Sequence, residues 1–163
     1  MKKSLLFTLF SESQLLQNIG SELDLERVPV TLHEFPDGET YLKVDVDPKN
    51  KTCVIFETLS CPNPKFLPLV FLAETLRDLG AKQVGLIAPY LSYMRQDKRF
   101  HPGEALTAKY FAKLISNCFD WMITVDPHLH RIKTLQDIYS IPTAVVHAAV
   151  DISHWIKIHI NRP

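Results

Sequence analysis

The sequence has no net charge, few cysteines and no long apolar run. Its 18 Lys and Arg residues cancel its 18 Asp and Glu residues, which excludes a polybasic nucleic-acid binder or membrane-surface protein as the default. Cys53, Cys61 and Cys118 include no C-x-x-C pair for zinc or redox chemistry. No stretch approaches the roughly 20 apolar residues of a membrane span, and the polar residues 11–14 interrupt the N-terminal apolar run too early for a signal peptide. We expect a cytoplasmic protein that binds neither nucleic acid nor a membrane.

The glycine-rich phosphate motifs are also missing. With only 5 glycines, the sequence contains neither G-x-x-x-x-G-K before Ser or Thr nor G-x-G-x-x-G, so the P-loop and the Rossmann dinucleotide mode are both excluded. The sequence has enough hydrophobic residues to form a sizeable core, because they make up 46% of its 163 residues. We expect one domain, or half of a larger protein.

Short apolar runs rich in Val, Ile and Phe alternate with stretches of helical period. The clearest helix pattern has Leu69, Leu72 and Leu76 at three- and four-residue spacing, with Gly80 placed as a C-terminal stop. This alternation predicts an α/β fold with a doubly wound, mostly parallel sheet. The expected strands are 3–10, 52–57, 83–89, 119–125 and 143–147, and the expected helices are 12–23, 66–79, 104–117 and 151–160.

Residues 28–34 and 40–46 interrupt the alternation and predict a β-hairpin insertion with an Asp-Gly turn. Its tip carries an aromatic ring and two carboxylates. The ring suits stacking on a purine base, and a carboxylate can accept a hydrogen bond from an exocyclic amine. The alternative is an ordinary Asp-Gly turn with no binding role. The residues of this tip are Phe35, Asp37, Gly38 and Glu39.

A second candidate, residues 89–104, leaves the carboxyl end of the expected strand 83–89, where α/β sheets bind ligands. Arg95, Lys98 and Arg99 can neutralise a polyphosphate, and Gln96 adds neutral hydrogen bonds. The alternative is a solvated charged loop. A loop this long without an apolar period is unusual in a compact domain, which favours a binding role.

A third candidate follows the next strand, where Asp126 and His128 lie two residues apart. Both can turn into one crevice and hold a divalent cation, and His128 could equally donate to a phosphate oxygen. A zinc site is disfavoured because His128 and His130 lack a nearby third ligand. Alternatively, the two histidines cap the next helix. Together, the three candidate segments are the parts that a magnesium-nucleotide crevice requires.

In this order and spacing, three motifs resemble the ribose-phosphate pyrophosphokinase family, also called phosphoribosyl pyrophosphate synthetases. They are Phe35-Pro-Asp-Gly-Glu39, Tyr93-Met-Arg-Gln-Asp-Lys98 and Val125-Asp-Pro-His128. The similarity covers nearly the whole chain, including residues 74–81 and 103–109, and residues 97–104 look closer to the archaeal-type branch than to the common hexameric one.

The resemblance implies a phosphoribosyltransferase-like sheet and transfer of the β,γ-diphosphoryl group of ATP to the anomeric hydroxyl of ribose 5-phosphate. It also implies Mg²⁺ as cofactor, a homo-oligomer, and a site divided between subunits. Asp126 and His128 would fall on the metal and triphosphate region, with His128 favoured as the direct contact. The implied ATP-binding residues are Phe35, Asp37, Gly38 and Glu39 on adenine from a neighbouring subunit, Arg95 and Gln96 on the nucleotide, and Asp97, Lys98 and Arg99 in the closing loop.

The sequence also departs from the family pattern. Family members are about twice as long and have two α/β halves, and this chain has no adjacent acidic pair and no Gly-Gly for the ribose-5-phosphate loop. We therefore expect residues 1–163 to be a single N-terminal domain, inactive alone, with ribose 5-phosphate bound only when the C-terminal half is present. Residues 129–131 depart from the usual small residue and Gln, and no metal role is carried over to Asp137. The alternatives are a non-catalytic homologue that regulates full-length synthetase subunits, and a small nucleotide-binding enzyme of unrelated chemistry.

Overall fold

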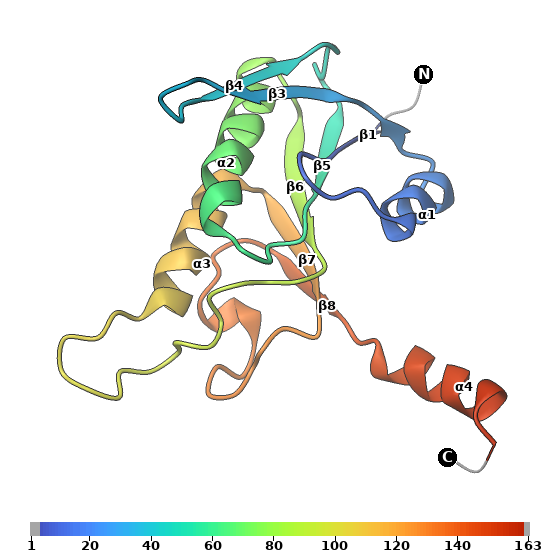
Figure 1. Cartoon of the computed structure of the whole chain (residues 1–163), viewed down its shortest axis with the longest axis vertical. Helices are drawn as coiled ribbons and strands as arrows, with labels where there is room; N and C mark the ends of the chain where they lie inside the picture. The colour runs from blue at the N-terminus through green and yellow to red at the C-terminus, as the bar shows by residue number, and fades with distance from the viewer. Residues whose placement is uncertain (1–3, 162–163) are drawn as a thin grey trace.

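A six-stranded parallel sheet forms the centre of the molecule (Figure 1). The computed structural model describes residues 4–161 and places the strands in the order β2-β1-β5-β6-β7-β8, so the predicted mostly parallel α/β fold is confirmed. Lys3, within the first predicted strand, lies outside the described residues. The strands are β1 Ser4–Phe7, β2 Glu26–Arg27, β5 Thr52–Phe56, β6 Gln83–Ala88, β7 Trp121–Val125 and β8 Thr143–Val146.

Helices cover both faces of this sheet, as a doubly wound fold requires (Figure 1). On one face, α1 (Gln14–Glu22) packs Leu16 into a small buried cluster with Leu6. On the other face, α2 (Asn63–Asp78) and α3 (Thr107–Cys118) contribute to a larger buried cluster. Burial on both faces explains why the strands read as continuous apolar runs instead of alternating ones.

The two remaining strands, β3 (Val30–Glu34) and β4 (Thr40–Val44), form an antiparallel hairpin beside α2 (Figure 1). Gly38 at its tip has φ +89°, a backbone conformation that side chains with a Cβ rarely adopt. The N–H of Gly38 donates to the carbonyl of Phe35 at 2.9 Å. The predicted hairpin and its Asp-Gly turn are therefore confirmed.

Two helices begin later than predicted, because side chains upstream of them have other partners. Ser13 is the N-cap of α1, and its Oγ accepts a hydrogen bond from the N–H of Leu16 at 3.2 Å. Glu104 belongs to the loop before α3, where its carboxylate accepts from the N–H of Phe100 at 2.7 Å and its carbonyl accepts from Nε of Arg99 at 2.8 Å.

Two short elements escape prediction from the sequence. Strand β2 has 2 residues, both exposed, so it carries no apolar pattern. The 3₁₀ helix η1 (Leu135–Asp137) is closed by a reciprocal capping box between Thr134 and Asp137, and a hydrogen bond from the backbone of Thr134 is the main cause of a lowered pKa for the Asp137 carboxyl. The N-cap of the next α-helix, residues 149–159, is Ala148, with no side-chain cap. The alternative in which His128 and His130 cap the next helix is therefore wrong, because neither is the cap of this helix or of η1.

Gly85 in β6 and Trp121 in β7 lie opposite each other in the sheet. A Cβ atom at position 85 would lie 2.0 Å from Cε2 of Trp121. Glycine is thus the residue that leaves room for the indole ring, which packs against the α1 face of the sheet. This close approach explains a glycine within an otherwise apolar strand.

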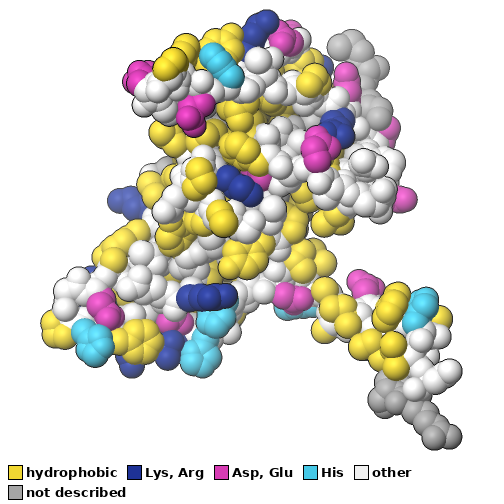
Figure 2. Space-filling view, in the orientation of Figure 1, with side chains coloured by type: hydrophobic (Ala, Val, Ile, Leu, Met, Phe, Trp, Pro, Cys, Tyr) yellow, Lys and Arg dark blue, Asp and Glu magenta, His cyan; other side chains and the backbone are white. Residues whose placement is uncertain are grey.

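Helix α4 (Ala149–His159) stands away from the sheet after β8 (Figure 1). None of its residues is buried: Val150 and Ile158 are each 70% exposed, and Trp155 is 55% exposed. Figure 2 shows hydrophobic side chains along its visible face. A helix with apolar side chains on several sides is usually enclosed by other elements. Within residues 4–161, no helix combines the length and the apolar character that crossing a membrane requires.

Candidate functional site

The loops after β5, β6 and β7 leave the same carboxyl edge of the sheet. The N–H of Leu59, after β5, donates to the carbonyl of Tyr90, after β6, at 3.0 Å. The N–H of Asp126, after β7, donates to the carbonyl of Val146 in β8 at 3.1 Å. Since α/β sheets bind ligands at this edge, the polar residues of these loops are the candidates for a binding site.

Arg95 and Gln96 are adjacent but have different surroundings. Arg95 is exposed, and its side chain has no hydrogen bond or ion pair with any residue that the structure describes. Gln96 supports the start of α3, because its Oε1 accepts from Oγ1 of Thr107 at 3.2 Å and its carbonyl accepts from the N–H of Ala108 at 3.3 Å. The guanidinium of Arg95 is thus available for an anion, whereas Gln96 already positions a helix.

Asp97 connects the loop after β6 to the loop after β7. Its Oδ1 accepts from Nη1 of Arg131 at 2.9 Å, and its Oδ2 accepts from the backbone N–H of Arg131 at 3.2 Å. Only 1% of the Asp97 side chain is exposed. Burial alone would raise the pKa of its carboxyl, but the hydrogen bonds and the charge of Arg131 outweigh this effect and hold the pKa below its usual value. Asp97 therefore faces a protein cation instead of open solvent.

The other two predicted loop cations have partners close to themselves in sequence. Nζ of Lys98 lies 5.6 Å from the ring centroid of Phe100. Arg99 donates to the carbonyl of Glu104 at 2.8 Å and to the hydroxyl of Tyr110 at 3.4 Å. Both cations are exposed, so they can reach an anion only by exchanging or sharing these contacts.

Asp126 bonds to the segment that leads into α4. Its Oδ1 lies 3.0 Å from Nδ1 of His147, and its Oδ2 accepts from the N–H of Ala148 at 3.1 Å. Hydrogen bonds first from His147 and then from Ala148 lower the pKa of this carboxyl. Asp126 also has φ +38°, a strained value for a residue with a Cβ. The side chain stays ionised, with both oxygens already accepting one hydrogen bond each.

The same segment offers few further ligands for a metal ion. The rings of His128 and His130 are 6.3 Å apart between centroids. Within residues 4–161, no three His, Cys, Asp or Glu side chains form a cluster that could hold a metal. Mg²⁺ that arrives with a polyphosphate usually needs only one or two protein carboxylates. Asp126 fits such a single-carboxylate role.

Two buried hydroxyls lie on the same loops and strands. Ser92 Oγ, in the loop after β6, and Thr124 Oγ1, in β7, have no hydrogen-bond partner among the described residues. An unpaired buried hydroxyl is costly unless a ligand or water satisfies it. At this edge of the sheet, two buried hydroxyl groups are therefore left without a hydrogen-bond partner from the described part of the protein.

The hairpin tip lies apart from these loops. Figure 1 shows it at the opposite end of the molecule from the loops after β6 and β7, so the three predicted segments do not form one crevice within a single chain. Phe35 is 43% exposed and meets the ring of His33 edge-on at 4.8 Å. Oδ1 of Asp37 accepts from the N–H of Glu39 at 3.2 Å, which stabilises the turn. A ligand bound at the loops after β6 and β7 of the same chain therefore lies away from the ring of Phe35, which is exposed to other ligands or to another chain.

Sequence reasoning missed a buried carboxylate, Glu57, directly after β5. Its Oε2 accepts from the N–H of Phe10 at 3.0 Å, and Nζ of Lys65 lies 3.5 Å from its Oε1. The side chain is fully buried and ties the loop after β1 to the end of β5. The available signal was a lone Glu at the end of an apolar run. Arg131 was also missed, although it is the cation nearest to the Asp126 motif in sequence.

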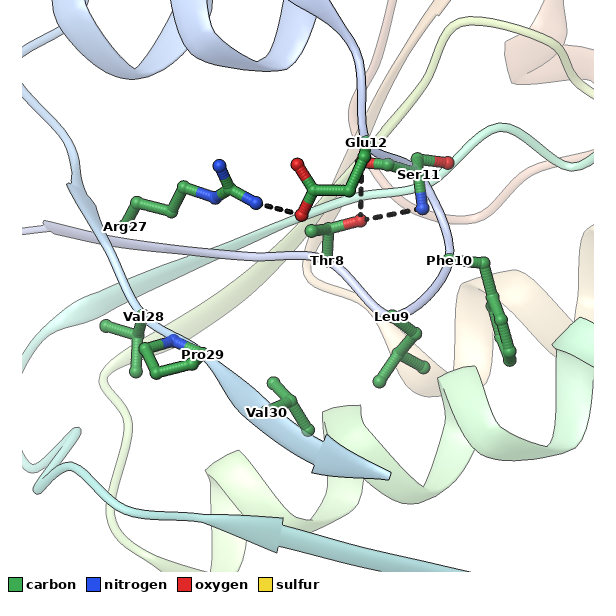
Figure 3. Close-up of a pocket in the computed structure, with 9 residues that line it drawn as sticks. All are labelled: Thr8, Leu9, Phe10, Ser11, Glu12, Arg27, Val28, Pro29 and Val30. Carbon is green, nitrogen blue, oxygen red and sulfur yellow. Dashed lines mark hydrogen bonds and ion pairs between the residues drawn. The ribbon is translucent and has the colours of Figure 1, made fainter. Parts of the chain in front are cut away.

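A cavity of about 440 Å³ opens beside the loop after β1, at the carboxyl end of that strand (Figure 3). Leu9, Val28 and Val30 give it an apolar side, and Arg27 and Glu12 pair with each other on the opposite side. Arg27 and Glu12 neutralise each other's charge, and the hydroxyl of Ser11 is directed to Glu57 outside the cavity, so the described residues that line the cavity offer no unpaired cation for a polyphosphate. The loops after β6 and β7 are the better candidate site.

The chain is similar in sequence to members of one enzyme family. Residues 4–118 match the family model described as the N-terminal domain of ribose phosphate pyrophosphokinase. The chain is 37% identical over 152 residues to a ribose-phosphate pyrophosphokinase of Methanobrevibacter smithii, covering 93% of this chain and 50% of that protein. It is 38% identical over 114 residues to one of Saccharolobus solfataricus, covering 69% of this chain and 39% of that protein. The chain thus spans about half the length of the first of these relatives, and less of the second.

The fold is also similar to that of a solved structure. Phosphoribosylpyrophosphate synthetase from Mycobacterium smegmatis superposes with a TM-score of 0.86 at 23% identity, covering 97% of this chain and 53% of that one. At this identity the likeness supports the fold alone. The match of the family model over most of the sequence carries the assignment: the chain belongs to the ribose-phosphate pyrophosphokinase family, of which it contains the N-terminal domain.

Proposed function

We propose that the chain is the ATP-binding, N-terminal part of an enzyme that converts ATP and ribose 5-phosphate to phosphoribosyl pyrophosphate and AMP. In this reaction the anomeric oxygen of the sugar attacks the β-phosphorus, and the bond from that phosphorus to the oxygen bridging it to the α-phosphorus breaks. The observation that carries the proposal is that the cationic loop after β6 lies beside the Asp126 loop, joined by Asp97 and Arg131. The match of residues 4–118 to the family model also supports the proposal.

In this proposal, Arg95 and Gln96 bind the nucleotide phosphates, and Lys98 and Arg99 move onto them. Asp97 does not contact the phosphates in this proposal, because its carboxylate bonds to Arg131. Asp126 holds Mg²⁺ together with the phosphates, and His128 donates to a phosphate oxygen. The bound Mg²⁺ would neutralise charge that develops on the phosphate oxygens during transfer. The other residues orient the triphosphate and exclude water from it.

The hairpin would serve a second copy of the chain. Phe35, Asp37, Gly38 and Glu39 would contact adenine in the neighbouring subunit, which agrees with their distance from this chain's own loops (Figure 1). A homo-oligomer is further supported by the uncovered apolar residues of α4. We propose that the protein is cytoplasmic.

The domain proposal is that residues 1–163 form one N-terminal domain and that ribose 5-phosphate binds only together with a C-terminal half. The isolated chain should therefore bind Mg-ATP without making phosphoribosyl pyrophosphate. Calorimetric titration with Mg-ATP and a product assay with ATP and ribose 5-phosphate test this. Absence of Mg-ATP binding would remove the ATP-binding role, and product free of host enzyme would overturn the inactivity of the isolated chain.

A second candidate function is supported by α4. A non-catalytic homologue that regulates full-length synthetase subunits needs a surface for them, and the exposed apolar side chains of α4 supply one. Co-expression with a full-length synthetase separates the two candidates, because only the regulatory one predicts a stable hetero-complex with altered turnover.

A further inference from the structure

Arg131 lies where two loops of the candidate site meet. Its backbone N–H and its Nη1 both donate to the carboxylate of Asp97, at 3.2 and 2.9 Å. Its guanidinium carbon lies 5.2 Å from the ring centroid of Phe100, four residues after the nucleotide-binding Gln96. One side chain of the loop after β7 therefore contacts two residues of the loop after β6.

Apolar packing also joins these loops, because Met94 of the loop after β6 shares a buried cluster with Leu135 and Tyr139 after β7. Among the residues that the structure describes, the hydrogen bonds between the two loops are those from Arg131 to Asp97 and a contact of 4.0 Å from the hydroxyl of Tyr139 to the sulfur of Met94. Lys98 and Arg99 bind within their own segment and α3. Exposed ion pairs usually contribute little, but here the Asp97 side chain is 1% exposed and accepts two charge-assisted or backbone bonds from one residue. The contact thus has the geometry of a fixed connection.

We propose that Arg131 is a positioning residue for the triphosphate site. By holding Asp97, it fixes the adjacent Arg95 and Gln96 relative to Asp126 and His128 before the nucleotide arrives. This inference rests on the proposed function, since it assigns a role within the same site. Residues 129–131 are also where the sequence departs from the usual family pattern.

The consequence is preorganisation. A loop that is already held in place loses less conformational freedom on binding, so more of the interaction with the phosphates appears as affinity. Without Arg131, residues 95–100 would keep only their contacts to α3 and within their own segment, so the ligand would have to supply more of their ordering. Removing Arg131 should therefore lower the affinity for ATP, whose phosphates contact the loop in this proposal, and leave the affinity for adenosine unchanged.

Asp97→Asn separates positioning from simple charge attraction. The substitution keeps the size of the side chain and removes a negative charge next to the proposed phosphate site. If only the total charge mattered, Mg-ATP would bind more tightly. If Asp97 and Arg131 act as a connection, Mg-ATP should bind more weakly, because the carboxylate that holds Arg131 is gone.

The experiment uses the full chain with Arg131→Ala, Asp97→Asn, the double variant, and Lys133→Ala as control. Lys133 is an exposed cation two residues away in the same loop. Titration with Mg-ATP and adenosine should show about a tenfold loss of Mg-ATP affinity for each single variant and no change for adenosine. The double variant should lose no more than either single one. Hydrogen exchange of residues 98–104 without ligand should accelerate in these three variants and not in Lys133→Ala.

The outcomes distinguish the inference from the proposed function. If wild type binds Mg-ATP but Arg131→Ala binds it equally well, or Asp97→Asn binds it more tightly, the positioning role is wrong and the ATP-binding proposal stands. Additive losses in the double variant would also overturn the connection. If wild type does not bind Mg-ATP, the proposed function fails and the positioning role fails with it.

Discussion

Oγ of Ser11 donates a hydrogen bond of 2.5 Å to Oε1 of Glu57, across 46 positions of sequence. The same hydroxyl accepts from the N–H of Thr58 at 3.0 Å, and Oε2 of Glu57 accepts from the N–H of Phe10 at 3.0 Å. Nζ of Lys65 completes the surroundings of the carboxylate at 3.5 Å. A fully buried charge is thus satisfied by donors from the loop after β1 and from α2.

Glu57→Gln should destabilise the protein, because the amide brings an NH₂ group toward donors that need an acceptor. We expect a loss of about 1.5–3 kcal/mol in the free energy of unfolding, the range for hydrogen bonds to charged groups. Urea unfolding measures this, with Glu22→Gln on the exposed surface of α1 as control. Equal stability of the two variants would contradict the role given to the Glu57 network.

Arg95→Ala and Phe35→Ala should differ in which ligand they weaken. Loss of Arg95 should cost about 1.5–3 kcal/mol with Mg-ATP, roughly ten- to a hundredfold in affinity, and much less with adenosine. Loss of Phe35 should weaken both ligands alike, by up to about 1–3 kcal/mol for stacking on one base. Calorimetric titration checks both.

The control for Arg95 is Lys82→Ala, which removes an exposed cation from the other end of β6. Equal weakening of ATP and adenosine by Arg95→Ala, with the fold intact, would mean that the loop after β6 does not bind the phosphates.

Gly85→Ala should destabilise the sheet, since its Cβ would lie 2.0 Å from Trp121. The indole must move from its packed position, at an expected cost of about 1–3 kcal/mol. Gly20→Ala is a control of opposite sign. At Gly20, inside α1, the nearest atom to a new Cβ is 3.5 Å away, so alanine should stabilise the helix by about 0.5–1 kcal/mol. Both changes are measured by urea unfolding, and a neutral Gly85→Ala would refute the steric role of Gly85.

The fold was predictable because its signals are local. The apolar runs, the helical period before Gly80 and the Asp37-Gly38 turn each appear within a short window of sequence. The two-residue strand β2 was not predictable, because Glu26 and Arg27 are both exposed and pair with β1 only through their backbone.

The candidate site was predictable only in part. The carboxyl-edge rule and the motifs selected Arg95 and Asp126, but the contacts of these loops depend on residues distant in sequence. Asp97 bonds to Arg131, 34 positions away, and no periodicity or motif encodes that contact. The position of Phe35, far from the other candidates, follows from packing of the hairpin on α2. Tertiary packing, which no short window contains, decides these features.

Trp155→Ser should reduce self-association of the chain. Trp155 is 55% exposed on α4 and stacks on His159, so its indole contributes to an uncovered apolar surface. Sedimentation of wild type should show oligomers that dissociate in this variant. His154→Ser, an exposed polar position on the same helix, should leave the oligomers unchanged. A monomeric wild type at tens of micromolar would contradict this use of α4.

The contact between Asp97 and Arg131 should give stability that depends on pH in a defined direction. Arg131 holds the pKa of Asp97 below its usual value in the folded protein, whereas in the unfolded chain the carboxyl titrates near its ordinary value of about 3.9. The unfolded state therefore takes up the proton first as pH falls. The contribution to stability is fully present above about pH 4 and is lost as pH falls through the folded-state pKa.

Asp97→Asn isolates this contribution from other carboxyls. Asp126 and Asp137 also have lowered pKa values and titrate in the same acidic range, but they do so in wild type and variant alike. We expect the difference in free energy of unfolding between wild type and Asp97→Asn to be constant from pH 7 to about pH 5, where Asp97 is ionised in both states. It should then shrink at lower pH. Urea unfolding at a series of pH values measures it, and a difference that stayed constant down to pH 2.5 would mean that the ionised Asp97 does not hold Arg131.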